Sequence, residues 1–274
     1  MRYIRGATTL SIVLVDTGIG NGKTRANPAW HDLRTGYLDR LTAAGFPPDS
    51  VDLVVLTHLH TDHVGWNTRE VNGAWVPTFP GARYVTSRVE REFWAGYVMD
   101  EPRRQMFDDS VLPVEAAGLL DLVDVPPEGA DIAPGLRLLP TPGHTPGHMA
   151  VQLTSQGETA LITGDCVHHP VQFAHPAIGS CVDIDPEQSE ESRRKLLGSL
   201  ADTVELENSS LLRRLIARRC VYGVDINPLA VELAQGLGGV PVRIDNHARA
   251  IAQSEILFGR PAARRSLVHL FVGN

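Results

Sequence analysis

The segment Thr57–His63 constrains this chain most, because it places three histidines and one aspartate within six consecutive residues. It directly follows the apolar run Val51–Leu56, which predicts a buried strand. Polar side chains at a strand end are costly to desolvate unless something binds them. Neutral imidazole and carboxylate are the ligands of zinc and similar ions. The segment therefore predicts a metal site rather than an exposed polar loop with chance histidines.

The spacing within this segment indicates how its ligands are arranged. His58 and His60 are separated by one residue, so both side chains leave an extended backbone on the same side. Asp62 and His63 come after the turn begins and reach its other side. We therefore expect a second ion there.

Two later segments add candidate ligands, each at the end of a predicted strand. They are Thr141–His148, which reads TPGHTPGH, and Thr163–Asp165, which reads TGD. Proline and glycine form rigid turns with little side-chain bulk, so the backbone can approach an ion closely. Asp165 follows an apolar run and would be costly to bury unless it is paired or bound to metal.

Charge and cysteine content exclude several classes of protein. The chain has 274 residues and a net charge of -7, without a long block of like charges, which argues against nucleic-acid binding. The basic cluster Arg193–Lys195 is interpreted as the solvated face of a helix. The three cysteines form no CxxC pair, which fits a reducing compartment. No apolar stretch reaches the roughly 18 residues of a membrane span. We expect a cytoplasmic protein that binds neither nucleic acid nor membrane.

The order of predicted elements indicates an α/β chain, or an α+β chain with two sheets. A helix is expected over Pro28–Ala44, another after the capping residue Ser87, and a third between Pro186 and Leu200. The expected strands are Leu10–Val15, Val51–Leu56, Arg83–Thr86, Leu136–Leu139, Met149–Leu153 and Ala160–Thr163.

The motifs HLHTDH, TPGHTPGH and TGD, in this order and at these spacings, resemble the metallo-β-lactamase superfamily. The resemblance runs from about Ser11 to Thr203. It implies an αββα sandwich of two mixed sheets flanked by helices, with a domain over residues 1–203. Residues 204–274 would form an atypical C-terminal segment, and its packing on the same domain stays open.

The same resemblance implies a ligand set for two divalent metal ions, with zinc as the first choice. His58, His60 and His144 would hold the first ion. Asp62 and His63 would hold the second, and Asp165 would bridge both. His148 is not a ligand in the family, so it would support a ligand or pack beside one.

The motifs also indicate which branch of the superfamily the chain resembles. An HxHxDH motif with a bridging aspartate is similar to lactonases, glyoxalase II-like thioesterases, phosphodiesterases and methyl-parathion-hydrolase-like enzymes. The segments VGWNTR, WVPTFPGARY and GDCVHHPVQ look most like the lactonase and organophosphate-hydrolase branch. His168, three residues after Asp165, stands where acyl-homoserine lactonases have tyrosine.

The resemblance implies hydrolysis by a water that two metals activate. Asp62 or Asp165 would accept the proton, and His168 would donate a hydrogen bond to the substrate oxygen. Alternatively, His168, His169 and His175 form only a polar pocket rim. Cys166 is expected to be a small buried residue rather than a nucleophile.

The expected activity is that of a lactonase of the acyl-homoserine-lactone type, as in quorum quenching, or of a related esterase. The alternatives are a phosphotriesterase, a β-lactamase-type hydrolase, and a metal-binding protein with impaired catalysis. The partner would be a small-molecule lactone or ester, and a homodimer stays open.

The C-terminal segment departs from the family, which has one more histidine at the end of a late strand. Leu211–Gln235 instead resembles a fragment of a DNA adenine methyltransferase, without its glycine-rich loop or its catalytic motif. His247 follows the strand-like run Val240–Ile244 and is the predicted replacement ligand. His269 or water are the alternatives.

Overall fold

This computed structural model describes residues 12–201, apart from 156–157 and 170. These residues divide into two compact units. Unit 1 contains the described chain up to Thr86 together with Trp94–Val123, and unit 2 contains Ser87–Phe93 together with the described chain from Asp124 onward. None of the described helices is long and apolar enough to cross a membrane.

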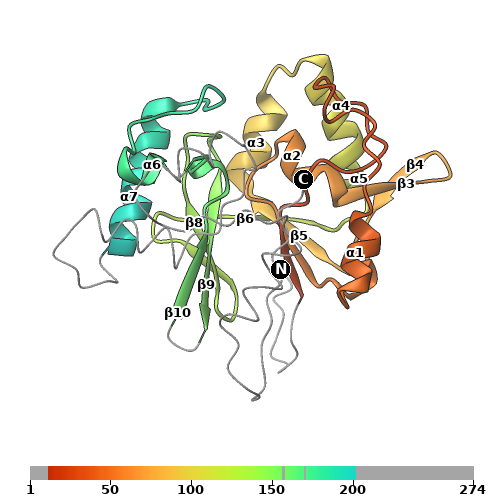
Figure 1. Cartoon of the computed structure of the whole chain (residues 1–274), viewed down its shortest axis with the longest axis horizontal. Helices are drawn as coiled ribbons and strands as arrows, with labels where there is room; N and C mark the ends of the chain where they lie inside the picture. Colours follow the sequence, from red (N-terminus) through yellow and green to blue (C-terminus); the bar gives the residue numbers. More distant parts are fainter. Residues whose placement is uncertain (1–11, 156–157, 170, 202–274) are drawn as a thin grey trace, which may run out of the picture. The chain divides into compact units, whose positions relative to one another are not determined.

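Unit 1 is built on a four-stranded sheet in the order β1-β2-β5-β6, in which β1, β2 and β5 are parallel (Figure 1). Strands β1 and β2 are buried along their whole length, because all their residues are apolar. The strands are β1 (Val13–Val15), β2 (Leu53–Val55), β5 (Arg83–Ser87) and β6 (Leu120–Val123), and a separate hairpin joins β3 (Thr68–Val71) to β4 (Ala74–Pro77).

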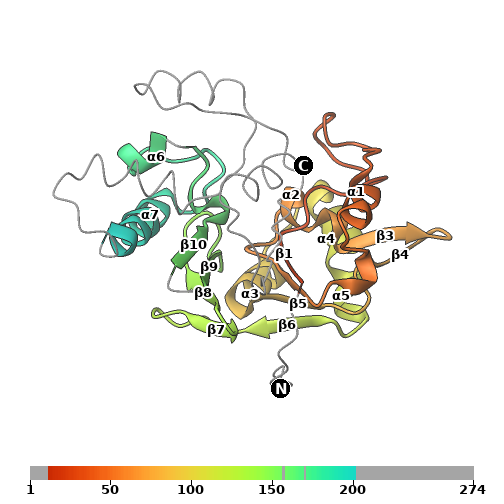
Figure 2. The ribbon, with the colours of Figure 1, turned by 60° about the horizontal axis from the view of Figure 1, so that its bottom comes forward.

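Short helices connect these strands (Figure 2). They are α1 (Tyr37–Ala43), α2 (Thr61–Val64), α3 (Arg88–Gly96), α4 (Glu101–Ser110) and α5 (Leu112–Ala116), with 3₁₀ turns at Pro48–Ser50 and Gly65–Asn67. The residues of α3 up to Phe93 belong to unit 2, and those from Trp94 belong to unit 1. Helix α2 begins shortly after β2 ends, so the histidine-rich segment lies at the carboxyl end of a central strand.

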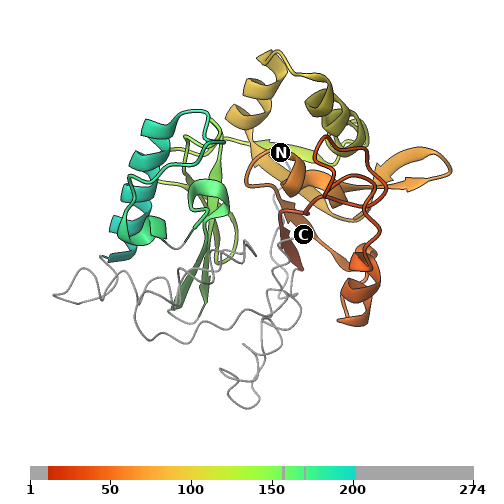
Figure 3. The same cartoon turned by 45° about the horizontal axis from the view of Figure 1, so that its top comes forward.

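Unit 2 is built on an antiparallel sheet in the order β10-β9-β8-β7, with α7 lying along one of its faces (Figure 3). Its TPGHTPGH turn connects β8 to β9, and the 3₁₀ turn Gly164–Cys166 follows β10. The elements are β7 (Ala130–Ala133), β8 (Leu136–Pro140), β9 (Met149–Ser155), β10 (Glu158–Ile162), α6 (Val171–Ala174) and α7 (Pro186–Ala201).

Most predicted elements are confirmed within a few residues, including the Ser87 cap, whose Oγ accepts a hydrogen bond from Glu90 N at 3.0 Å. The helix predicted over Pro28–Ala44 is wrong in its first half, because only Tyr37–Ala43 is helical. Asp32 adopts a positive φ of 48° and donates its backbone N–H to Lys23 O at 2.8 Å. This long-range loop hydrogen bond overrides the local helical periodicity.

Unit 1 contains a buried charge cluster around Asp109. Its carboxylate pairs with Arg25 Nη1 at 2.6 Å and with Lys23 Nζ at 3.2 Å. Lys23 Nζ also donates to Thr68 Oγ1 at 2.7 Å and lies 3.8 Å from the centre of the Trp75 ring. The partners replace the water that both cations lose on burial.

The Lys23 ammonium makes unfolding depend on pH. Burial lowers its pKa from 10.5 to about 8, against the opposing attraction of Asp109. Between these values the unfolded chain binds a proton that the folded chain does not, so this contribution to the free energy of unfolding rises with pH. We expect the wild type to gain stability over Lys23→Met between about pH 7.5 and about pH 10. Urea unfolding at both pH values measures this, and a constant difference would contradict it.

Candidate metal centre

In unit 1, His58 lies in a bend after β2 and His60 has extended backbone, and α2 then carries Asp62 and His63. The rings of His58 and His60 meet edge to face, with centroids 4.6 Å apart. His63 Nε2 lies 3.7 Å from Asp62 Oδ2. The rings of His58 and His63 are also close, with centroids 4.1 Å apart.

Asp16, at the end of β1, determines which ring nitrogen of two histidines is protonated. Its Oδ2 accepts hydrogen bonds from Thr57 Oγ1 and His63 Nδ1, both at 2.8 Å. Because the Thr57 hydroxyl donates to Asp16, it accepts from His58 Nδ1 at 3.0 Å. Both histidines therefore carry Nδ1–H, and Nε2 is the nitrogen that can bind a metal ion.

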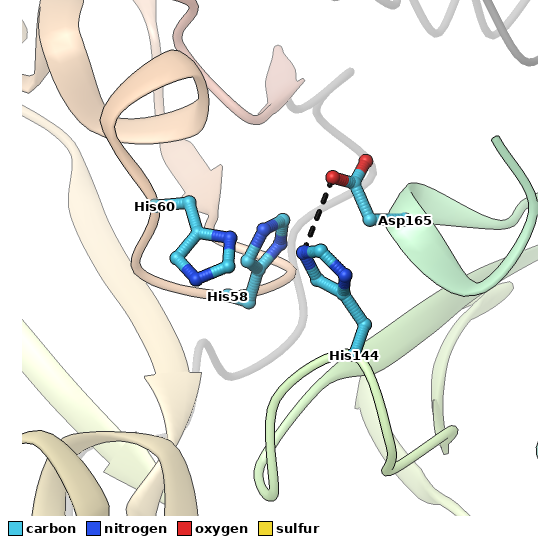
Figure 4. A group of neighbouring side chains, drawn as sticks. All are labelled: His58, His60, His144 and Asp165. Atoms are coloured by element: carbon cyan, nitrogen blue, oxygen red, sulfur yellow. Dashed lines mark ion pairs between the residues drawn. The ribbon is translucent and has the colours of Figure 1, made fainter. Parts of the chain in front are cut away.

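In unit 2, His144 lies in the turn between β8 and β9, and Asp165 lies in the turn that follows β10. His144 Nε2 is 3.3 Å from Asp165 Oδ2, as marked in Figure 4. His168 Nε2 lies 3.5 Å from the same carboxylate oxygen. Asp165 is therefore flanked by two imidazoles, and its carboxylate lies among groups that divalent ions bind.

His148 supports Asp165, as its place in the motif implied. It is buried, and its Nδ1 lies 2.7 Å from Thr141 Oγ1. Its Nε2 accepts the backbone N–H of Asp165 at 3.0 Å, so the proton of a neutral ring is on Nδ1. The ring thus fixes the backbone from which the Asp165 carboxylate extends.

Two substitutions separate these hydrogen bonds. Gln at position 148 can place an amide oxygen where Nε2 was and keep the bond from Asp165 N, whereas Asn reaches only the Nδ1 position. We expect His148→Asn to weaken zinc binding about 10-fold or more, and His148→Gln to weaken it less. Competition with a chelator measures both affinities. Equal losses in the two variants would contradict this role.

The TPGHTPGH turn itself is held by Glu90, a fully buried residue of α3. Glu90 Oε2 accepts from Thr145 Oγ1 at 2.6 Å and from Gly147 N at 3.1 Å. The contact leaves no room for a side chain at Gly147, where a Cβ would lie 2.1 Å from Glu90 N. The turn needs glycine because helix α3 packs directly on its backbone.

Gly147→Ala should therefore lower the free energy of unfolding by about 1–3 kcal/mol, because turn and helix must separate. Gly198→Ala in α7 is the matched control, since a Cβ there meets nothing within 4 Å. Urea unfolding of both variants measures the difference. A Gly147→Ala protein as stable as the control would show that the turn can move freely.

The candidate metal ligands drawn in Figure 4 are His58 and His60 of unit 1, and His144 and Asp165 of unit 2. The donor set fits a divalent ion, because His58, His63 and His144 each engage Nδ1 in a hydrogen bond and present Nε2. Asp62 and His63 lie outside this group. His247, predicted as the last ligand, and the expected boundary after residue 203 lie outside the described residues.

The other predicted residues differ in their surroundings. The ring nitrogens of His168 are buried and have no hydrogen-bond partner among the described residues. His169 Nδ1 accepts the backbone N–H of Val171 at 3.0 Å, and His175 is exposed. Cys166 is buried, and burial raises the pKa of its thiol to about 12. Cys166 therefore fits the expected packing role, since a nucleophile would need an accessible thiolate.

Sequence reasoning missed two aspartates that contact these ligands, Asp16 and Asp183. Asp16 follows the β1 run directly, so its position at a strand end was a usable signal. Asp183 offered none, because it lies in an irregular loop and its partner His144 is 39 residues away. The interpretation of the basic cluster as a solvated face is correct for Arg194 and Lys195, which are exposed, and wrong for Arg193. Arg193 is fully buried, and its guanidinium donates to the carbonyl oxygens of Pro176 and Cys166.

The chain is similar in sequence to known lactonases. N-acyl homoserine lactonase of Bacillus thuringiensis is 28% identical over 134 residues, which are 48% of this chain and 45% of the relative. N-acyl homoserine lactonase AttM of Agrobacterium fabrum is 33% identical over 129 residues, 43% of this chain and 42% of the relative. This chain thus spans less than half the length of the curated relatives that it matches.

Solved structures extend the similarity. AidC, a dizinc quorum-quenching lactonase in complex with a product, is 27% identical, with a TM-score of 0.58 over 72% of this chain and 67% of AidC. The hydrolase AbOPH is 29% identical, with a TM-score of 0.56 over 70% of this chain and 65% of AbOPH. The family model of the metallo-beta-lactamase superfamily matches residues 6–205. The expected α/β fold with sheets and helices is confirmed, and this chain belongs to the metallo-beta-lactamase superfamily.

Proposed function

We propose that this protein is a metal-dependent hydrolase that opens lactones of the N-acyl homoserine lactone type, or cleaves related esters. The observation that carries the proposal is the anchoring of three histidines through Nδ1, which leaves each Nε2 as the metal-binding atom. The relatives named above support the substrate class, because they are lactonases of this type.

The ligands that we propose for a first ion are His58, His60 and His144. Asp62 and His63 would hold a second ion, Asp165 would bridge both, and His247 would complete the second set. Two divalent ions, with zinc as the first choice, would supply a water of lowered pKa and polarise the substrate carbonyl.

The remaining steps belong to side chains of this chain. Asp62 has a side chain that is 38% exposed, so it can accept a proton from water and release it to solvent. Asp165 is the alternative acceptor, with a side chain that is 23% exposed. His168 would donate a hydrogen bond to the substrate oxygen, and its ring nitrogens lack a competing hydrogen-bond partner among the described residues.

Parallel assays test the substrate class. Purified protein loaded with zinc is mixed with N-hexanoyl-homoserine lactone, with paraoxon and with nitrocefin, and hydrolysis is followed for each. We expect hydrolysis of the lactone to be the fastest. Hydrolysis of nitrocefin alone would overturn the lactonase proposal, and fastest hydrolysis of paraoxon would indicate a phosphotriesterase.

Measuring the zinc content of the same samples tests the alternative of a metal-binding protein with impaired catalysis. If the protein binds zinc and yet hydrolyses none of the three compounds, it is a metal-binding protein without this activity. If His247→Ala leaves the zinc content unchanged, the assignment of His247 as the last ligand is wrong.

A further inference from the structure

Asp183 is a carboxylate with no exposed side-chain surface, in the loop between α6 and α7. Its Oδ1 lies 3.1 Å from His144 Nδ1, and its Oδ2 accepts the backbone N–H of Ser180 at 3.1 Å. Arg193 Nη1 is 3.6 Å from Oδ2, beyond hydrogen-bond distance. The short contacts of this buried carboxylate are therefore to His144 and to Ser180.

A carboxylate accepts hydrogen bonds and donates none, so the shared proton is on His144 Nδ1. The lone pair of a neutral ring is then on Nε2, the nitrogen that lies 3.3 Å from Asp165 Oδ2. We propose that Asp183 is a positioning residue, which holds His144 in the Nδ1–H form and aims its Nε2 at a divalent metal ion. This inference rests on the metal site of the proposed function, but not on any particular substrate.

The loop that carries Asp183 is tied to the His144 turn by its backbone. Ile184 N donates to His144 O at 3.1 Å, and Asp185 N donates to Gly143 O at 2.8 Å. A Cβ at Gly143 would lie 2.1 Å from Ser189 N, so the start of α7 packs on the same turn. Asp183 therefore faces His144 from a backbone that is already fixed against it.

Arg193 of α7 links this loop to the turn that carries Asp165. Its Nη1 donates to Ser189 Oγ at 2.6 Å and to Cys166 O at 3.3 Å, and its Nε donates to Pro176 O at 2.9 Å. One buried guanidinium thus contacts the residue next to Asp165 and faces Asp183. It compensates the charge of Asp183 without taking the oxygen that His144 uses.

Asp183→Asn is the primary test, because it keeps the shape of the side chain and replaces one of its two acceptor oxygens with an NH₂ donor. The asparagine oxygen will face Ser180 N–H, so its NH₂ group faces His144 Nδ1 and favours the opposite tautomer, with Nε2 protonated. We expect zinc affinity, measured by competition with a chelator, to fall about 10–100-fold. In the metal-free protein, ¹⁵N spectra of the histidine rings should show His144 as Nδ1–H in the wild type and as Nε2–H in the variant.

Asp185→Asn is the matched control. Asp185 lies two residues away, is exposed, and accepts Gln188 N at the start of α7, which asparagine also does. Its zinc affinity should equal that of the wild type. Unchanged zinc affinity in Asp183→Asn would overturn the proposal.

A double variant separates positioning from a merely structural role. Asp183→Asn leaves the Arg193 charge buried without compensation, and Arg193→Gln added to it removes that charge. We expect the double variant to regain stability in urea but not zinc affinity, whereas recovery of both would overturn the proposal. Wild-type protein that binds no zinc would instead refute the proposed function. The ¹⁵N spectra of His144 would then still show whether Asp183 sets the tautomer of this ring.

Discussion

Asp165→Ala is expected to lower the rate of lactone hydrolysis by at least about 1,000-fold, because Asp165 would help to hold the ions that lower the pKa of the attacking water. The carboxylate lies against His144 Nε2 at 3.3 Å and His168 Nε2 at 3.5 Å, where a bridging ligand is expected. Initial rates on N-hexanoyl-homoserine lactone, with zinc content measured on the same samples, test this.

The control for this prediction is Asp124→Ala, which removes an exposed carboxylate paired with Arg88 in the same unit. It should retain the wild-type rate and zinc content. If Asp165→Ala keeps its zinc and more than about a tenth of the rate, Asp165 is not a bridging ligand.

Asp109→Ala is expected to lower the free energy of unfolding by about 3–5 kcal/mol, because it leaves two buried cations without their counter-charge. Asp109 accepts hydrogen bonds from Arg25 Nη1 at 2.6 Å and Nη2 at 2.9 Å, and from Lys23 Nζ at 3.2 Å. Solvent does not hydrate the two cations in the wild type, since both side chains are at most 2% exposed. Urea unfolding measures the loss.

Asp108→Ala on the same helix is its control, because Asp108 is exposed. It should change the stability by less than about 0.5 kcal/mol. A loss below about 1 kcal/mol in Asp109→Ala would mean that the cations find other partners or water, and would refute the structural role of the cluster.

The parts of the candidate site that were predictable from sequence are those governed by local backbone geometry. His58 and His60 follow β2, and Asp62 and His63 lie in the short helix α2, so their closeness in sequence alone indicated that these side chains lie near one another. The TPGHTPGH motif likewise predicted a turn after a strand, because proline and glycine restrict the backbone there.

The supporting residues were not predictable, because their partners are distant in sequence. Asp16 reaches His63 across 47 residues, and Asp183 reaches His144 across 39. Arg193 belongs to a basic cluster, and charge alone indicates a solvated helix face. Only the fold places backbone carbonyl oxygens around it, which is why it is buried.

The fold was predictable to a similar degree. Strands with continuous apolar runs were placed within a few residues, because burial on both faces leaves a clear pattern. The hairpin of β3 and β4 was missed, since β3 is largely exposed and polar and the apolar run of β4 is only four residues long. The first half of the predicted helix over Pro28–Ala44 failed because hydrogen bonds to residues 21–23 hold that segment as a loop.

The zinc content of the purified full-length protein tests the central claim most directly. After dialysis against buffer with trace zinc, elemental analysis of the wild type should give two ions per chain. The matched sample of His144→Ala should give fewer. Wild-type protein that binds no zinc or other divalent ion would contradict the claim that these histidines and aspartates form a hydrolytic metal centre.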